Sequence, residues 1–209
     1  MFRQLTPVVR ALLYANFIAF GLYLLLGERL VDIFALWPLN SARYNLPPFE
    51  PWQLITYAFL HGGWLHILSN MFAVYMFGPD CESLLGSRRF TIYYFTCVVG
   101  AAVCQLLVTQ YLYPAQGATV GASGGIFGIL LLFGMAFPRR QLLLLFPPIP
   151  MPAWLFVTLY GLYELWLGVT QTQQGVAHFA HLGGMATGYL LIRYWRFRAG
   201  SRPGGRRGY

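Results

Sequence analysis

Ser123 stands in a run of small residues, Gly121-Ala122-Ser123-Gly124-Gly125, at the start of an apolar stretch that continues to Phe137. The small neighbours leave room for a substrate beside the hydroxyl, so Ser123 could act as a nucleophile. The same pattern is common where two membrane helices pack closely, and taken alone it favours packing. A catalytic interpretation therefore depends on a base and on further polar groups near Ser123.

The four histidines of the chain all fall in or beside apolar stretches, where ionisable side chains are costly and usually functional. They are His61, His66, His178 and His181. His66 and Asn70 are four residues apart, so on a helix they share a face, and both can donate hydrogen bonds. His181 is followed by Gly184 and Gly188, a spacing that lets its helix pack tightly against a partner.

Close packing of this helix against the glycine-lined helix that begins near Ser123 would bring the hydroxyl to His181. The pair would supply a nucleophile and a general base. An attacked carbonyl also needs donors for the negative oxygen that develops on it. Backbone N–H groups at the start of the serine's helix could supply them, together with His66 and Asn70.

The composition indicates that these residues belong to membrane helices. Of the 209 residues, 57% are hydrophobic and only 10% are charged, which is too apolar for a soluble domain of this size. Six apolar segments predict spanning helices. They are the run after Arg10 that reaches Leu26, and about residues 64–77, 90–112, 123–137, 153–169 and 177–195. The first is expected to remain uncleaved, since no small-x-small cleavage site follows it.

The predicted fold class is an all-α membrane protein with a six-transmembrane-helix bundle over residues 1–198. The segment 27–63 mixes charges, prolines and aromatic residues, which predicts an interfacial first loop. Residues 199–209 predict a disordered tail rich in arginine and glycine. The second span is expected to end at Gly78-Pro79-Asp80.

The net charge of +8 comes entirely from arginine, and the positions of the arginines favour membrane topology over nucleic-acid binding. With six spans both termini lie on one side, which would hold twelve arginines; only Arg29 and Arg43 lie opposite. Because basic residues accumulate on the cytoplasmic side, both termini are predicted to be cytoplasmic. No nucleic-acid partner is expected.

The chain resembles the rhomboid family of intramembrane serine proteases. Each motif alone is weak, but their order, spacing and placement agree over the second to sixth spans. The matching stretches are His61-Gly-Gly-Trp-Leu-His66-Ile-Leu-Ser-Asn70, Glu82-Ser-Leu-Leu-Gly86-Ser87, Gly121-Ala-Ser123-Gly-Gly and Ala180-His181-Leu-Gly-Gly184-Met-Ala-Thr-Gly188.

The resemblance implies that Ser123 is the nucleophile and His181 the general base of a dyad without an acidic third member. It implies an oxyanion hole made by His66, Asn70 and the Ser123 backbone, and packing of Phe127 against the histidine ring. Many members have tyrosine at the position of Phe127. Many also have Trp-Arg in the first loop where this chain has Trp52-Gln53.

The remaining polar residues have simpler interpretations. His61 is expected to tie the first loop to the core, and Glu82 to anchor the connection to the third span with Gly86 and Ser87. His178 is an alternative base that lacks the glycine spacing of His181. Glu164 is a lone acid in the fifth span, and a neutral or hydrogen-bonded role is favoured for it. No metal site is predicted, because the histidines lack a nearby cysteine or carboxylate.

The predicted function is hydrolysis of peptide bonds in or near transmembrane segments of membrane proteins by an intramembrane serine endopeptidase. It needs no cofactor, and its partners would be such substrates and the lipid bilayer. The compact set of spans favours a bacterial inner membrane. Two alternatives stay open: a catalytically inactive rhomboid-like factor that binds membrane proteins, and a small channel or transporter that uses the histidines. The sequence does not indicate the oligomeric state.

Overall fold

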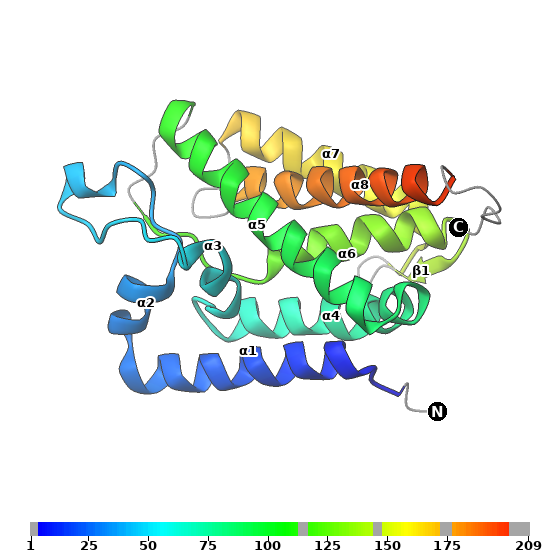
Figure 1. Cartoon of the computed structure of the whole chain (residues 1–209), viewed down its shortest axis with the longest axis horizontal. Coiled ribbons are helices and arrows are strands. Elements are labelled where there is room, and N and C mark those ends of the chain that lie inside the picture. Colours follow the sequence, from blue (N-terminus) through cyan, green and yellow to red (C-terminus); the bar gives the residue numbers. More distant parts are fainter. Residues whose placement is uncertain (1–3, 113–116, 144–147, 172–176, 201–209) are drawn as a thin grey trace.

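A computed structural model describes residues 4–112, 117–143, 148–171 and 177–200 of the chain. The described part is built almost entirely of helices (Figure 1). The α-helices are α1 (Pro7–Leu26), α2 (Glu28–Phe34), α3 (Gln53–Thr56), α4 (Trp64–Leu85), α5 (Ser87–Tyr111), α6 (Ser123–Ala136), α7 (Ala153–Thr170) and α8 (His178–Gly200). There are also two described 3-10 helices, η1 (Ser41–Tyr44) and η2 (Tyr57–Phe59). Two short antiparallel strands pair with each other, β1 (Gln141–Leu143) and β2 (Pro150–Pro152).

The six long helices α1, α4, α5, α6, α7 and α8 confirm the predicted all-α architecture. By length and composition α1, α5 and α7 can each cross a membrane. The helix α4 was expected to end at Pro79 but continues to Leu85. A proline removes one backbone hydrogen bond and need not end a helix. Here Gly78 packs so closely on Val9 of α1 that a Cβ would overlap it, which holds α4 in place through the proline.

The helix α8 ends at Gly200, two residues after the predicted end of the membrane domain at residue 198. The rest of the predicted tail, residues 201–209, lies outside the described residues.

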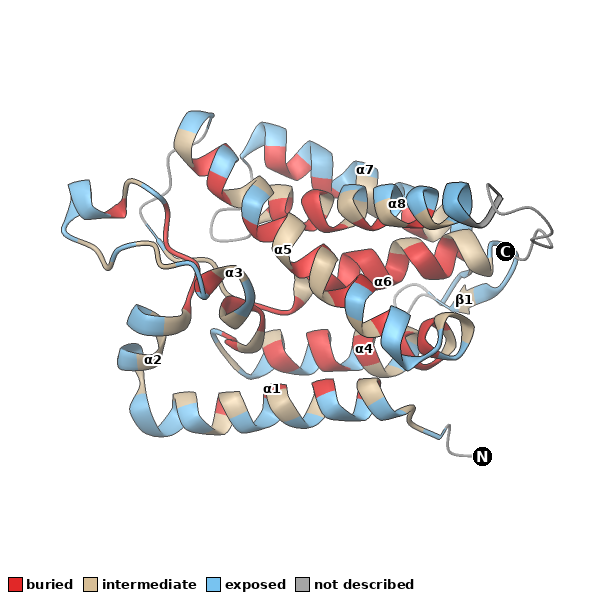
Figure 2. Ribbon diagram, viewed as in Figure 1, coloured by how far each residue is buried: buried red, intermediate tan, exposed pale blue. Residues whose placement is uncertain are grey.

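The helix α6 lies at the centre of the bundle and contacts α4, α5, α7 and α8 (Figure 1). Ten of its fourteen residues are buried, and Figure 2 shows this burial along almost the whole helix. Fourteen residues extend about 21 Å, which is less than the roughly 30 Å of a hydrocarbon core. The first residue of α6 therefore lies below the level reached by the longer helices around it.

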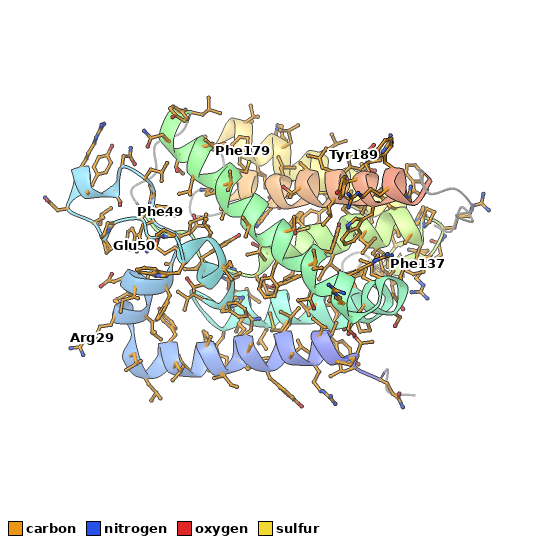
Figure 3. All side chains as sticks on the ribbon, viewed as in Figure 1. Arg29, Phe49, Glu50, Phe137, Phe179 and Tyr189 are labelled. Atoms are coloured by element: carbon orange, nitrogen blue, oxygen red, sulfur yellow. The ribbon has the colours of Figure 1, made fainter. Side chains whose placement is uncertain are left out.

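The arginines separate between the two ends of the bundle as the sequence predicts. The start of α1, the start of α5 and the end of α8 lie at one end (Figure 1). The described arginines at this end are Arg10, Arg88, Arg89, Arg139, Arg140, Arg193, Arg196 and Arg198. Arg29 lies at the opposite end with α2, as Figure 3 shows.

The segment 27–63 folds beside the end of the bundle where Arg29 lies, and Figure 3 shows Phe49 and Glu50 in it. Gln53 is buried and holds this segment together. Its side-chain oxygen accepts a hydrogen bond from Trp37 N at 3.1 Å, and its amide donates to the carbonyls of Ile33 and Pro48. A glutamine thus anchors the first loop. Exposed apolar side chains on the same segment, Leu39, Tyr44 and Ile55, fit an interfacial location.

Glu82 lies near the C-terminal end of α4 and anchors that end of the helix. Its carboxylate accepts hydrogen bonds from the backbone N–H groups of Val8 at 3.0 Å and Val9 at 2.9 Å, and from the Ser87 hydroxyl at 2.6 Å. The first N–H groups of a helix have no intrahelical acceptor, so Glu82 caps α1 from a distance of 73 residues along the chain. The predicted role with Ser87 is confirmed and extends to α1.

Candidate active site

Ser123 is the first residue of α6, and the backbone before it is held in a conformation that favours glycine. Gly121 has a φ of 125° and donates its N–H to the Tyr57 carbonyl at 2.9 Å. A Cβ at this position would lie 2.7 Å from His66 Nε2. Gly121 is therefore needed both for the backbone turn and for the close approach of the His66 ring to the serine.

The hydroxyl of Ser123 meets the imidazole of His181. The distance from Ser123 Oγ to His181 Nε2 is 2.8 Å, which is a hydrogen-bond distance. The two side chains meet because α6 and α8 approach at their glycines: a Cβ on Gly184 would overlap the carbonyl oxygen of Gly124. The predicted contact between two glycine-lined helices is present.

The second glycine of the α8 pair faces a different neighbour. A Cβ on Gly188 would overlap the hydroxyl of Tyr93 on α5. The spacing from Gly184 to Gly188 thus serves two helix contacts, one with α6 and one with α5.

The ring of His181 is stacked on Phe127, four residues after the serine. The ring centroids are 4.3 Å apart and the planes differ by 7°. Tyr160 of α7 packs on the same phenylalanine at 4.9 Å. An aromatic face is sufficient for this stacking, so the missing hydroxyl at position 127 leaves the orientation of His181 intact.

A cavity of about 340 Å³ opens beside Ser123 Oγ. His66, Asn70, Phe127 and His181 line it together with Ser123, so the sequence-predicted groups gather around one space. Backbone N–H groups at the start of α6 carry no side-chain cap among the described residues. These N–H groups and the dipole of α6 favour a negative charge beside the serine.

Asn70 and His66 form the α4 wall of the cavity. The Asn70 amide donates one hydrogen bond to the His66 carbonyl at 2.8 Å, and an amide has a second N–H. His61 packs edge-on against the His66 ring at a centroid distance of 4.9 Å. Burial, with the neighbouring His66, lowers the pKa of His61 to about 4, so His61 is neutral at pH 7. His61 thus packs on His66 from the loop that precedes α4.

Glu164 of α7 contacts the edge of the His181 ring that points away from Ser123. Its Oε2 lies 2.7 Å from His181 Nδ1 and 2.7 Å from His178 Nδ1. His181 therefore has an acidic neighbour, although the resemblance implies a dyad without an acidic third member. The acid is nearly fully buried, as are both histidines.

Glu164, His178 and His181 are residue types that bind metals, and their ligand atoms lie within 4.8 Å of one another. The argument that a carboxylate is lacking near the histidines was wrong. However, ligands of a tetrahedral zinc lie about 3.3 Å apart, whereas each nitrogen–oxygen distance here is 2.7 Å. The geometry is that of two N–H groups donating to one carboxylate oxygen.

Comparison with known proteins identifies the family. The family model of the Rhomboid domain matches residues 48–197 of the chain. The chain belongs to the rhomboid family. The match contains α4 to α8 almost to the end of α8, and with them every residue of the cavity.

Individual rhomboid proteins are similar to the chain over most of its length. Rhomboid-like protein 11, chloroplastic, of Arabidopsis thaliana is 31% identical over 85% of the chain and 65% of its own length. The rhomboid YdcA of Bacillus subtilis (strain 168) is 30% identical over 91% and 89%. Rhomboid protease GlpG of Yersinia pestis (strain Pestoides F) is 27% identical over 95% and 66%. The chain thus spans just under two thirds of the plant and Yersinia relatives.

Rhomboid proteins are largely intramembrane serine proteases, and the chain shares their domain and their membrane helices. The structure brings Ser123, His181, His66, Asn70 and Phe127 of this rhomboid together. Glu82 lies away from the cavity, at the end of α4 that caps α1. Sequence reasoning missed the place of Glu164 beside His181. The one signal that pointed to it was an acid within an apolar helix.

Proposed function

We propose that this rhomboid is an intramembrane serine endopeptidase in which Ser123 is the nucleophile and His181 the general base. The observation that carries the proposal is the 2.8 Å contact between Ser123 Oγ and His181 Nε2 at the edge of a cavity that His66 and Asn70 also line, within a helical membrane bundle. A nucleophile and a base within hydrogen-bond reach are the basis of covalent catalysis. The start of a helix beside them suits a developing oxyanion.

In the proposed mechanism His181 Nε2 takes the proton of Ser123 Oγ as the oxygen attacks the scissile carbonyl. The negative oxygen of the tetrahedral intermediate points to the N–H groups at the start of α6, to His66 and to Asn70. The imidazolium then gives its proton to the leaving amine, and an acyl-enzyme remains on Ser123. A water molecule, deprotonated by His181, releases the acyl group. The chemistry uses side chains and water, without a cofactor.

The substrates are transmembrane segments of membrane proteins in the lipid bilayer. A carbonyl in a stable helix is engaged in a hydrogen bond, so a substrate must unwind locally before it can reach Ser123. Segments with small or helix-breaking residues unwind most easily. The position of Ser123 at the start of the short helix α6 supports cleavage inside or close to the membrane.

Both termini are proposed to face the cytoplasm, because the arginine-rich end of the bundle holds the start of α1 and the end of α8. The cavity then opens toward the non-cytoplasmic side. We propose a bacterial inner membrane as the location, and the bacterial origin of the relatives from Bacillus subtilis and Yersinia pestis supports this proposal.

The test is Ser123→Ala in purified protein, with cleavage of a transmembrane substrate and labelling by a fluorophosphonate as readouts. The variant is expected to lose both while it remains folded and membrane-inserted. Thr158→Ala is a matched control, because it removes an exposed hydroxyl of α7 that does not line the cavity. Cleavage by Ser123→Ala at the wild-type rate would exclude Ser123 as nucleophile. A wild type that neither cleaves nor labels would favour an inactive rhomboid-like binding factor.

A further inference from the structure

Glu164 is an acidic side chain buried in a membrane helix, and the proposed dyad chemistry does not require it. Its carboxylate is placed between α7 and α8, where the Oε2 atom accepts contacts of 2.7 Å from the Nδ1 atoms of His178 and His181. A buried carboxylate is unfavourable unless charge-assisted hydrogen bonds compensate for the lost water. Two ring N–H groups supply that compensation here.

The contact with Glu164 determines which nitrogen of His181 carries the proton. An ionised carboxylate accepts hydrogen bonds and cannot donate them, so Nδ1 of His181 must be the protonated nitrogen. The Nε2 atom then presents its lone pair to Ser123 Oγ, 2.8 Å away. This is the tautomer that a general base needs. The opposite tautomer would place a proton between Nε2 and the hydroxyl that has to be deprotonated.

His178 holds the carboxylate from a second direction. The rings of His178 and His181 are nearly perpendicular, at 87°, with centroids 6.2 Å apart. The two donors therefore approach the same oxygen along different lines. This fixes Glu164 on one side of His181, while Phe127 covers the face of the ring at 4.3 Å. The imidazole is thus restrained at Nδ1 and on its face, and Nε2 faces the serine.

We propose that Glu164 is a positioning residue that completes a Ser123–His181–Glu164 triad, in which His178 holds the carboxylate. The inference rests on the proposed function of the Ser123–His181 pair and extends it. When Ser123 Oγ loses its proton to His181 Nε2, the imidazolium forms directly against the Glu164 carboxylate. The carboxylate stays ionised throughout and takes no proton. It stabilises the positive ring and keeps the ring aligned for the return of the proton to the leaving amine.

The decisive variant is Glu164→Gln, which keeps the size of the side chain and removes its charge. It is expected to lower kcat by about ten-thousandfold, the loss seen when the acid of a catalytic triad is removed. KM should stay within about threefold of the wild type, because Glu164 contacts His181 rather than the substrate. The rate of labelling of Ser123 by a fluorophosphonate should fall by a similar factor.

Glu82→Gln is the matched control. It makes the same chemical change at another buried carboxylate, at the end of α4 that caps α1. It is expected to lower the thermal unfolding temperature in detergent and to leave kcat of the folded protein unchanged. A merely structural role of Glu164 would give the same pattern at position 164: lower stability with unchanged kcat and labelling rate. That result would overturn the proposal.

Two further variants keep the test decisive. If Glu164→Gln does not fold, Glu164→Met supplies a neutral side chain of similar length without a buried acceptor, and the same fall in kcat is expected of it. His178→Ala removes only the second donor and should lower kcat less than Glu164→Gln does. A larger effect of His178→Ala would overturn the assigned order of roles. Loss of cleavage in Ser123→Ala together with full kcat in Glu164→Gln would refute only the positioning role of Glu164. Full cleavage by Ser123→Ala would refute the proposed function itself.

Discussion

At the scale of residues, the cavity has two walls with different tasks. In the proposed mechanism His181 on one wall moves the proton, with Glu164 behind it at Nδ1, and His66 and Asn70 on the other wall meet the developing oxyanion. Asn70 and His66 lie one helical turn apart on α4, and the Asn70 amide is tied to the His66 carbonyl at 2.8 Å. That bond fixes the direction of the amide, so its remaining N–H is available to a ligand of the cavity.

Asn70→Ala and His66→Ala are each expected to lower kcat by about ten- to a thousandfold, because each removes one donor to the oxyanion. The measurement is steady-state cleavage of a transmembrane substrate. Asn16→Ala is the control for Asn70→Ala, since buried Asn16 of α1 also donates to the carbonyl four residues earlier, at 2.8 Å. The control should change stability only. Wild-type kcat in both cavity variants would remove the side-chain donors from the mechanism.

The sequence motifs were sufficient to predict Ser123, His181, His66, Asn70 and Phe127 as one group. They could not predict the partner of His181 Nδ1. Glu164 and His178 come together only through the rotation of α7 and α8 about their own axes, and a spacing along one helix does not determine the rotation of another. The similar depth of Glu164 and His181 in the bundle could be predicted. Glu164 lies six residues before the end of α7, and His181 lies three residues after the start of α8.

At the scale of elements, the site depends on the distance between α6 and α8. Gly184→Ala would place a Cβ against the backbone carbonyl of Gly124, which cannot move aside as a flexible side chain can. The two helices must separate, at a cost of about 1–3 kcal/mol. We expect a lower thermal unfolding temperature and lower kcat together, since the Ser123–His181 contact lengthens as the helices part.

Gly21→Ala is the control for this prediction. Gly21 also lies in a helix, but a Cβ there would meet nothing within 4 Å. Alanine is the better helix former, so this variant should be neutral or slightly stabilised. Equal stability and kcat in Gly184→Ala and Gly21→Ala would contradict a tight contact between α6 and α8.

The existence and order of the six long helices followed from their apolar length, whereas their ends did not. Gly78-Pro79 looks like a helix end in the sequence, yet α4 continues because Val9 of α1 packs on Gly78. The sequence likewise gives no sign that Gln53 anchors the first loop. Both outcomes depend on contacts between segments far apart in the chain, which local patterns do not contain.

At the scale of the whole molecule, the helices form a wall around one short helix. The helix α1 packs on α4, and α4, α5, α7 and α8 surround α6 (Figure 1). A helix of fourteen residues is too short to span a bilayer by itself. The helices around α6 supply the apolar surface toward lipid. Ser123, the first residue of α6, lines the cavity. The short helix thus contributes Ser123 from a position shielded by its neighbours, while α4 and α8 contribute His66, Asn70 and His181 to the same cavity.

The proposed orientation of this bundle rests on its charge, because eight of the described arginines lie at the end that holds the start of α1 and Arg29 lies at the other. We expect tags at both termini to be digested by a protease added to inverted inner-membrane vesicles and to be protected in right-side-out vesicles. A tag inserted after Asn45, in the first loop, should show the reverse pattern. Digestion of the terminal tags only in right-side-out vesicles would place the cavity open to the cytoplasm. Substrates would then have to be cut from that side, because Ser123 lies nearer the end of the bundle that holds the first loop.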